Sequence, residues 1–175
     1  QTSVAEKTAA LDFSYAYPAA AARIAPLRRW LDSDRVRLRT RTTKMAAADR
    51  REAVKSNFPF HRHDAMREWK VVTEPPRLLS LSGETYRFTG GAHGNTALEP
   101  LVWDKAKMRR VDPRAMFESS AAIQRVFGAG WCDWLKRERR RRLGSDVGKD
   151  DIFPCPPVSD LTVLLGSSDR RAIDR

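Results

Sequence analysis

The sequence predicts an α+β fold in which an antiparallel sheet meander packs against one long and one medium helix. Apolar residues alternate with polar ones in several short segments, which is typical of strands with one buried face. Two longer stretches instead carry apolar residues at helical spacing. With 175 residues, of which 41% are hydrophobic, the chain is long enough to form a packed core. No stretch approaches the roughly 18 uninterrupted apolar residues of a membrane helix.

Length and pattern together suggest one domain with two short ends. We expect a flexible N-terminus at residues 1–10 and a single domain at 11–165. Residues 166–175 are expected to be a tail or the start of further strands.

The first elements are a strand and a long helix. Leu11, Phe13, Tyr15 and Tyr17 alternate with smaller or polar residues, and Pro18 ends the strand. From Ala19 to about Lys55 there is no glycine, and four apolar residues recur every seven positions: Ile24, Leu31, Leu38 and Met45. We therefore predict one amphipathic helix that is loosely packed in its second half and presents a basic face there.

Short β segments fill the middle of the chain. They are Glu68–Thr73, Leu78–Phe88, Leu98–Trp103 and Arg109–Val111, with a hairpin turn at Asp104–Lys107. Gly83 interrupts the second segment and suggests a β-bulge there.

A second helix is expected from Ser119 to Leu143. The Ser119 hydroxyl can cap its first turn, and Gly144 can end it. The first half is apolar on one side and the last two turns are almost entirely basic. Leu161–Leu165 suggests one more strand.

The positive charge is concentrated in two segments. The chain has 33 Lys or Arg against 22 Asp or Glu, a formal net charge of +11, and residues 23–55 and 136–142 hold the whole excess. Such segments suit an anionic partner, which could be nucleic acid, a phospholipid surface or a cell-wall polymer, although two solvated helix faces would have the same composition. The candidate basic surface consists of Arg137, Arg139, Arg140, Arg141 and Arg142.

The two cysteines, Cys132 and Cys155, allow two interpretations. They form no C-x-x-C motif, which argues against a zinc ribbon or a redox pair. A disulfide between them would tie the second helix to a proline-rich loop in an oxidising compartment, whereas a cytosolic protein would keep two thiols. The first residue is Gln1 rather than Met, as after removal of an export signal, although a trimmed chain looks the same.

A glycine-rich segment, Gly90-Gly-Ala-His-Gly94, is the strongest candidate site. Its three glycines permit positive φ angles and close backbone approach, so N–H groups could converge on an anion beside His93. The spacing matches neither a dinucleotide fingerprint nor a Walker loop. Alternatively, the segment is simply a turn that connects two strands.

Signals for metal binding and catalysis are weak. His61 and His63 would lie on one face of an extended segment, but no third ligand is nearby. No serine lies in a nucleophile elbow, and neither cysteine has an obvious base. We therefore predict no metal, no cofactor and no catalytic residue.

The order of these segments, from Phe13-Ser-Tyr-Ala-Tyr17 to Asp112-Pro-Arg-Ala-Met-Phe117, resembles the exported PdaC/RsiV-like domain family over roughly residues 11–165. The most specific element is Tyr-x-x-Thr-Gly-Gly-Ala-His-Gly, here Tyr86 to Gly94. The family includes the non-catalytic module of a peptidoglycan deacetylase and the extracellular, lysozyme-sensing part of an anti-sigma factor. The resemblance implies an envelope-facing binding domain, periplasmic or otherwise extracytoplasmic, that lacks the family's C-terminal part.

The resemblance also implies a set of site residues. It implies that Cys132 and Cys155 are a pair. The ligand candidates in and beside the glycine segment are Tyr86, Gly90, Gly91, His93, Gly94 and Asn95.

Two functions from different classes are consistent with these observations. The first is a non-enzymatic binding module for a cell-wall glycan or an envelope protein, and the net positive charge favours an anionic wall over lysozyme, which is itself basic. The alternative is a non-specific nucleic-acid-binding protein that uses the Arg-rich helices. An enzyme acting on a wall polymer would require His93 to be catalytic.

Overall fold

The structure is a computed structural model that describes residues 1–144 and 154–174. The chain divides into two compact units, one formed by residues 1–111 with 164–175 and the other by residues 112–163. The first unit holds a six-stranded sheet and the longest helix, and the second unit holds another helix, which confirms the predicted α+β class.

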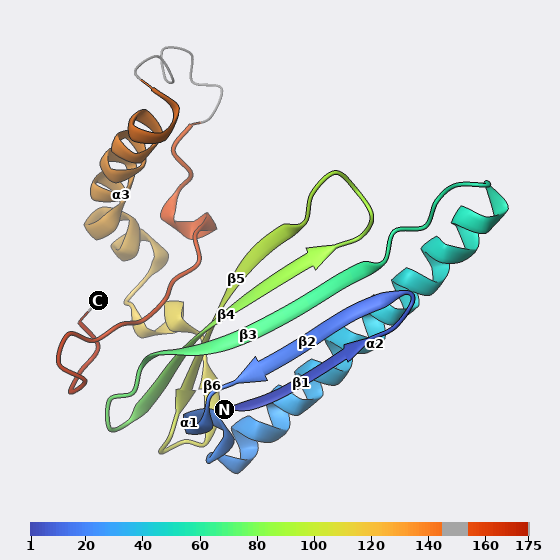
Figure 1. Ribbon diagram of the computed structural model, residues 1–175. Coiled ribbons are helices and arrows are strands. Elements are labelled where there is room, and N and C mark those ends of the chain that lie inside the picture. Colours follow the sequence, from blue (N-terminus) through green and yellow to red (C-terminus); the bar gives the residue numbers. More distant parts are fainter. Residues whose placement is uncertain (145–153, 175) are drawn as a thin grey trace. The chain divides into compact units, whose positions relative to one another are not determined.

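The six strands follow each other across the sheet in chain order. They are β1 (Thr2–Lys7), β2 (Leu11–Tyr17), β3 (His63–Thr73), β4 (Leu78–Phe88), β5 (Asn95–Asp104) and β6 (Arg109–Val111). All neighbours are antiparallel except β2 and β3, which run parallel because the chain crosses between them through a helix. Figure 1 shows this helix, α2, lying along β1 and β2.

The N-terminus is a strand, and the prediction of a flexible segment at residues 1–10 is wrong. Thr2 to Lys7 pair antiparallel with Tyr17 to Asp12 of β2. The side chains of β1 are exposed or half-buried, so the strand has no apolar alternation to reveal it. Backbone pairing at the sheet edge orders it instead.

Gly83 marks a close contact rather than a bulge. It pairs in regular register with Trp69, whose ring would lie 2.7 Å from a Cβ added to Gly83. The predicted bulge at Gly83 is therefore wrong, and the register shift of this strand pair falls between Val71 and Thr73. Glycine is needed here because the indole of the neighbouring strand occupies the side-chain space.

The predicted single helix is two helices, α1 (Ala19–Ala22) and α2 (Ala25–Lys55). Ile24 between them is extended, with φ −94° and ψ 97°. Pro26 explains the break, because it has no N–H to donate and its ring would clash with the carbonyl four residues earlier. Proline in the first turn suits the start of a new helix.

The buried face of α2 differs from the predicted seven-residue repeat. Leu31 is buried, but Met45 is 40% exposed, and the buried residues in the second half are Thr42 and Ala46. A straight helix rotates by about 20° per heptad relative to an exact seven-residue repeat, so Met45 has moved off the buried face.

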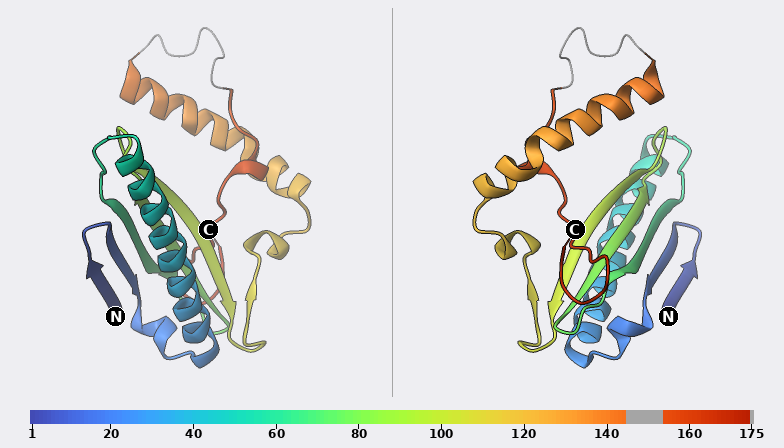
Figure 2. Two further views of the ribbon diagram at one scale, coloured as in Figure 1. Left: turned by 90° about the vertical axis from the view of Figure 1, so that its right-hand side faces the viewer. Right: turned by 90° about the vertical axis from the view of Figure 1, so that its left-hand side faces the viewer.

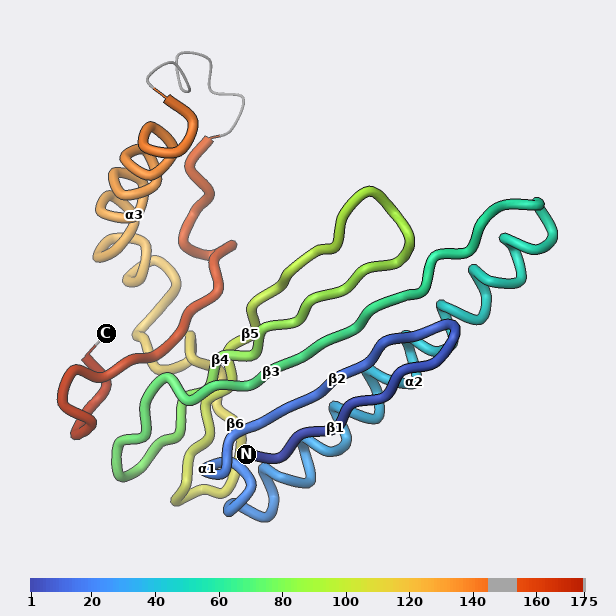
Figure 3. Tube along the Cα trace, viewed as in Figure 1, coloured from blue at the N-terminus to red at the C-terminus, as the bar shows by residue number. Residues whose placement is uncertain are grey.

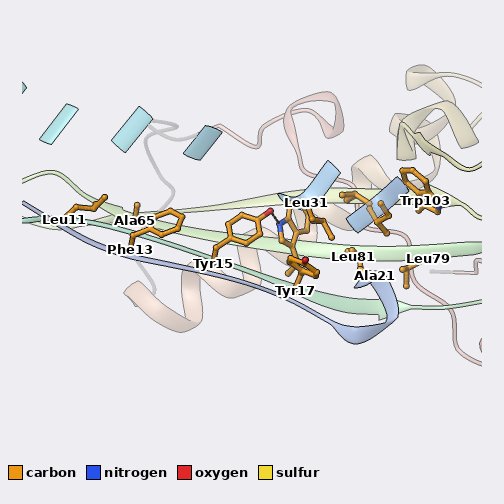
Figure 4. Packing of buried hydrophobic residues seen from close by; sticks show 13 residues of the cluster. Leu11, Phe13, Tyr15, Tyr17, Ala21, Leu31, Ala65, Leu79, Leu81 and Trp103 are labelled. Atoms are coloured by element: carbon orange, nitrogen blue, oxygen red, sulfur yellow. Dashed lines mark hydrogen bonds between the residues drawn. The ribbon is translucent and has the colours of Figure 1, made fainter. Parts of the chain in front are cut away.

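The hydrophobic core lies between α2 and one face of the sheet (Figures 2 and 4). Phe13, Leu27, Leu31, Leu79 and Leu81 are fully buried in it. Alternate residues of β2 reach this core, as the sequence predicted. The core therefore fixes which face of each strand points toward α2.

The second unit is organised by α3 (Ser120–Leu143). The Ser119 hydroxyl accepts a hydrogen bond from the N–H of Ala122 at 3.0 Å, and Gly144 ends the helix with φ 88°, which confirms both predicted caps. Before and after it lie two short 3₁₀ turns, η1 (Pro113–Met116) and η2 (Val158–Asp160).

Residues 161–165 do not form the predicted strand. The Arg114 guanidinium, in the second unit, donates to the carbonyls of Ser159 and Leu161, and Leu165, in the first unit, is 1% exposed. The apolar residues at 161–165 therefore reflect a partly buried segment. This segment pairs with no strand among the described residues.

Candidate functional site

The glycine-rich segment is the connection between β4 and β5, and Figure 3 shows it at the same end of the sheet as the connection from α2 to β3. Its glycines serve different purposes. Gly90 has φ +89°, which favours glycine, whereas Gly91 has open space where a side chain would lie. A Cβ on Gly94 would overlap the ring of Tyr86. Tyr86 and Gly94 therefore form one packed pair.

The other candidate ligand residues of this segment lie in different surroundings. Tyr86 pairs with Thr96 and Arg87 pairs with Asn95, so Tyr86 and Asn95 lie on opposite faces of the sheet. Asn95 lines a cavity of about 200 Å³ beside α2. His93 is exposed, and its Nδ1 lies 3.2 Å from the carbonyl oxygen of Gly94. The structure thus brings together Tyr86 and Gly94, with Gly90, His93 and Asn95 at separate positions around them.

A second cleft, of about 300 Å³, lies where α2 ends. His61 and His63 both line it, but His63 is a buried β3 residue while His61 precedes the strand. Asp49 and Glu52 from the last turns of α2 lie in the same cleft. No group of three or more His, Cys, Asp or Glu side chains among the described residues could hold a metal ion.

Sequence reasoning missed this cleft because its carboxylates come from the charged side of a helix. In the sequence, Asp49 and Glu52 look like two solvated acids among arginines. Only the turn at the end of α2 places them beside the histidines. The adjacent Asn57 was the available signal, since Asn tolerates a positive φ at a helix end.

A polar network is buried between α2 and the sheet. The Arg67 guanidinium donates to Asp34 at 2.8 Å, to Glu99 at 2.7 Å and to the Thr85 hydroxyl at 2.6 Å. The Tyr15 hydroxyl donates to Asp34 at 2.8 Å. Burial, and then the nearby Asp34 carboxylate, raise the pKa of Tyr15 far above its usual value. These groups satisfy one another, so the network joins α2 to β3 rather than forming an open site.

The cysteines are joined by a disulfide. The Cα atoms of Cys132 and Cys155 are 5.6 Å apart, which is within the expected limit. Beside the bridge, the indole N–H of Trp131 donates to the carbonyl of Pro156 at 3.2 Å. The bridge ties α3 to the proline-rich segment and belongs to the second unit alone.

The basic surface covers the last two turns of α3. Six of the seven residues from Lys136 to Arg142 are basic, and Glu138 is the exception. Glu138 accepts hydrogen bonds from Arg141 at 2.8 Å and from Arg142 at 3.4 Å. The Arg141 guanidinium is the main cause that holds the pKa of Glu138 below its usual range. A single carboxylate therefore pairs with two arginines, and the surface keeps a strong net positive charge.

Exposed apolar side chains accompany these cations. Phe127, Trp134 and Leu143 of α3 are each about half exposed or more. Even so, no helix in the described part of the chain is long and apolar enough to span a membrane.

The comparisons with known proteins give one family match. The family model described as Deacetylase PdaC matches residues 4–96. These residues begin within β1 and include β2 to β4, α2 and the whole glycine-rich connection. No curated protein gives a significant match.

Two solved structures are similar to this chain. The first is a DUF3298 family protein from Pseudomonas aeruginosa, with 16% sequence identity, a TM-score of 0.45, and coverage of 80% of this chain and 69% of that chain. The second is a DUF3298 family member from Bacteroides fragilis, with 18% identity, a TM-score of 0.44, and coverage of 79% and 67%.

Proposed function

From the fact that the chain belongs to the family described as Deacetylase PdaC, we propose that it is a non-enzymatic, extracytoplasmic domain that binds an anionic ligand of the cell envelope. The family match ends before α3 begins, so the ligand has to be argued from the chain's own residues.

The basic end of α3 is the observation that carries the proposal. The helix carries seven Lys or Arg residues against Asp133 and Glu138. Successive residues of a helix are rotated by about 100°, so consecutive arginines point in all directions around its axis. The side chains of Arg141 and Arg142 are 66% and 69% exposed even though both contact Glu138. Guanidinium groups bind carboxylates and phosphates through paired hydrogen bonds, which suits a polyanion.

The disulfide supports the extracytoplasmic part of the proposal. Disulfides persist in oxidising compartments and are rare in the cytosol. The Cys132–Cys155 bridge lies on the same helix as the basic surface, one turn ahead of it. A protein that faces the cell wall would meet the carboxylates of peptidoglycan stem peptides there.

The connection between β4 and β5 is the proposed glycan contact of the first unit. His93 and Gly91 are exposed at its tip, and Tyr86 is fixed against Gly94. These groups offer hydrogen-bonding and stacking surfaces. They are proposed as secondary contacts, in addition to the basic surface of the second unit.

Binding to purified peptidoglycan tests the function directly. The protein should be retained on peptidoglycan at low salt, and at least about tenfold more weakly at about 200 mM salt than at about 50 mM. The matched control is peptidoglycan whose carboxylates have been amidated, which should retain little. Equal retention on both forms, or none at low salt, would contradict the proposal.

Nucleic acid is the competing ligand, because phosphates attract the same guanidinium groups. Duplex DNA is therefore titrated under identical conditions, with lysozyme as a basic protein that should not bind. Tighter binding to DNA than to peptidoglycan, together with two free thiols in natively purified protein, would favour the nucleic-acid function.

A further inference from the structure

The cleft at the end of α2 is lined by acidic and aromatic residues, whereas the protein as a whole is strongly basic. The chain has 33 Lys or Arg residues, yet none is among the described residues that line this cleft. Its lining includes the carboxylates of Asp49 and Glu52 and the aromatic rings of Phe58 and Phe60. Its volume of about 300 Å³ suits a small molecule rather than a polymer.

The C-terminus of α2 shapes one wall of the cleft. Asn57 has φ 52°, and the N–H groups of Asn57 and Phe58 donate to the carbonyls of Val54 and Ala53. This is a Schellman motif, in which the residue after the left-handed position normally packs back on the helix. Phe58 is instead 73% exposed, so the rigid cap holds an aromatic ring at the mouth of the cleft.

The electrostatics of this wall favour a cation. The carbonyl end of a helix carries partial negative charge, and Asp49 and Glu52 lie in the last turns of α2. Aromatic ring faces attract cations as well. An anion would meet two carboxylates and the negative end of a helix in the same cleft.

His63 keeps the Asp49 carboxylate in place. Its Nε2 lies 3.1 Å from Asp49 Oδ2, and because a carboxylate only accepts, the hydrogen is on Nε2. The Nδ1 atom is buried and has no hydrogen-bond partner among the described residues. The contact orients the Asp49 carboxylate at the wall of the cleft. Phe60 stacks on the imidazole with ring centroids 5.8 Å apart and supports the arrangement.

We propose that this cleft binds a small organic ammonium ion, a protonated primary amine on a carbon skeleton about the size of one sugar. Asp49 and Glu52 accept hydrogen bonds from the ammonium group, and Phe58 covers its carbon skeleton. Glu52 is already positioned, because its Oε1 accepts a hydrogen bond from Ser56 at 3.1 Å. The site goes beyond the proposed function: it lies in the first unit and takes the opposite charge.

Titration with glucosamine, followed by NMR of the full chain at neutral pH, tests the site. Two matched probes isolate the ammonium group: glucose lacks the amine, and N-acetylglucosamine carries it as a neutral amide. Glucosamine should shift the amide signals of Phe58 and Gly90 with saturation, and both neutral sugars should bind at least about tenfold more weakly. Equal binding of all three sugars, or no saturable shift with glucosamine, would overturn the proposal.

Variants test the named residues. Glu52→Gln, which changes an exposed charge, should weaken glucosamine binding about tenfold, and Phe58→Ala severalfold. Asp49→Asn should weaken glucosamine binding as much. If this variant folds poorly because it loses the contact with His63, Glu52→Gln still tests the site. Glu84→Gln, at an exposed acid of β4 outside the cleft, is the control and should leave binding unchanged. Unchanged binding in Glu52→Gln would contradict the site, whereas wall retention depends on α3 and reports on the proposed function separately.

Discussion

The two long helices are both rich in arginine, but they use their charges differently. Arg35, Arg37 and Arg39 of α2 contact Asp32, Asp34 and Glu6, respectively, and α2 also buries Leu27 and Leu31 against the sheet. In α3 the buried residues are Ile123 and Gly128, and the basic residues outnumber the acids seven to two. Arginine content alone therefore does not identify a binding surface. The two helices differ in how closely their cations follow one another: six of the seven residues from Lys136 to Arg142 are basic, whereas the cations of α2 are spread over its length.

The largest difference should appear when one carboxylate is removed from each helix. Asp34→Ala leaves the buried guanidinium of Arg67 without its α2 partner and should lower the free energy of unfolding by about 3 kcal/mol. Glu138→Ala on α3 removes a partner from two exposed arginines and should leave the free energy of unfolding nearly unchanged. Chemical denaturation of both variants makes the comparison, and equal destabilisation would break it.

Reduction of the disulfide should affect only the helix that depends on it. Opening the bridge between Cys132 and Cys155, 23 residues apart, should destabilise the second unit by roughly 3 kcal/mol, because the unfolded chain regains conformational freedom. Hydrogen exchange with and without reductant measures this for each helix. Amides of α3 should exchange faster, while those of α2 and the sheet should keep their protection. A matching loss of protection in α2 would show that the two helices are not independent.

Alkaline pH should weaken the α2 region and spare α3. Burial and the Asp34 carboxylate raise the pKa of Tyr15 above its usual value of 10.0. The unfolded tyrosine therefore ionises first, so the stabilisation is complete below about pH 10 and declines as the pH rises beyond it. Urea denaturation between pH 8 and pH 11 should show this decline. Tyr15→Phe should reduce it, and the remainder should come from Tyr17, whose pKa is also raised by burial. A pH dependence that is identical in Tyr15→Phe would rule out this origin.

The smallest effect concerns the one acid within the basic end of α3. The Arg141 guanidinium holds the pKa of Glu138 below its ordinary value. Arg141→Gln should raise that pKa toward the ordinary value, but only in part, because Arg142 also contacts the carboxylate. An NMR pH titration of Glu138 reports the change. If the pKa stays the same, the contact seen between the two side chains does not persist in solution.

Regular elements with a buried face could be predicted from the sequence, whereas contacts between elements could not. The strand at Leu11–Tyr17 and the caps of α3 at Ser119 and Gly144 were predictable, because alternation and capping are local signals. The edge strand Thr2–Lys7 was not, because pairing with β2 rather than side-chain burial forms it. The same limit explains Gly83, which needs the ring of Trp69 from another strand to account for it.

The candidate site shows the same division. The sequence could single out the glycines at 90–94 but could not show that Tyr86 and Asn95 lie on opposite faces, since that depends on strand register. It could locate the basic segment of α3 directly. It could not find the cleft at Asp49 and Glu52, because those acids meet the histidines only after the chain turns at Asn57.

The central claim is that the cations of α3, and not those of α2, bind the anionic envelope ligand. Two variants remove equal charge from exposed positions: Lys136, Arg137 and Arg140 to Gln on α3, and Arg28, Arg29 and Lys44 to Gln on α2. Retention on purified peptidoglycan is measured for both across a salt series. The α3 variant should bind at least about tenfold more weakly, with a shallower salt dependence, and the α2 variant should stay within about twofold of the unaltered protein. An equal loss in the two variants would contradict the claim, because it would mean that net charge alone determines binding.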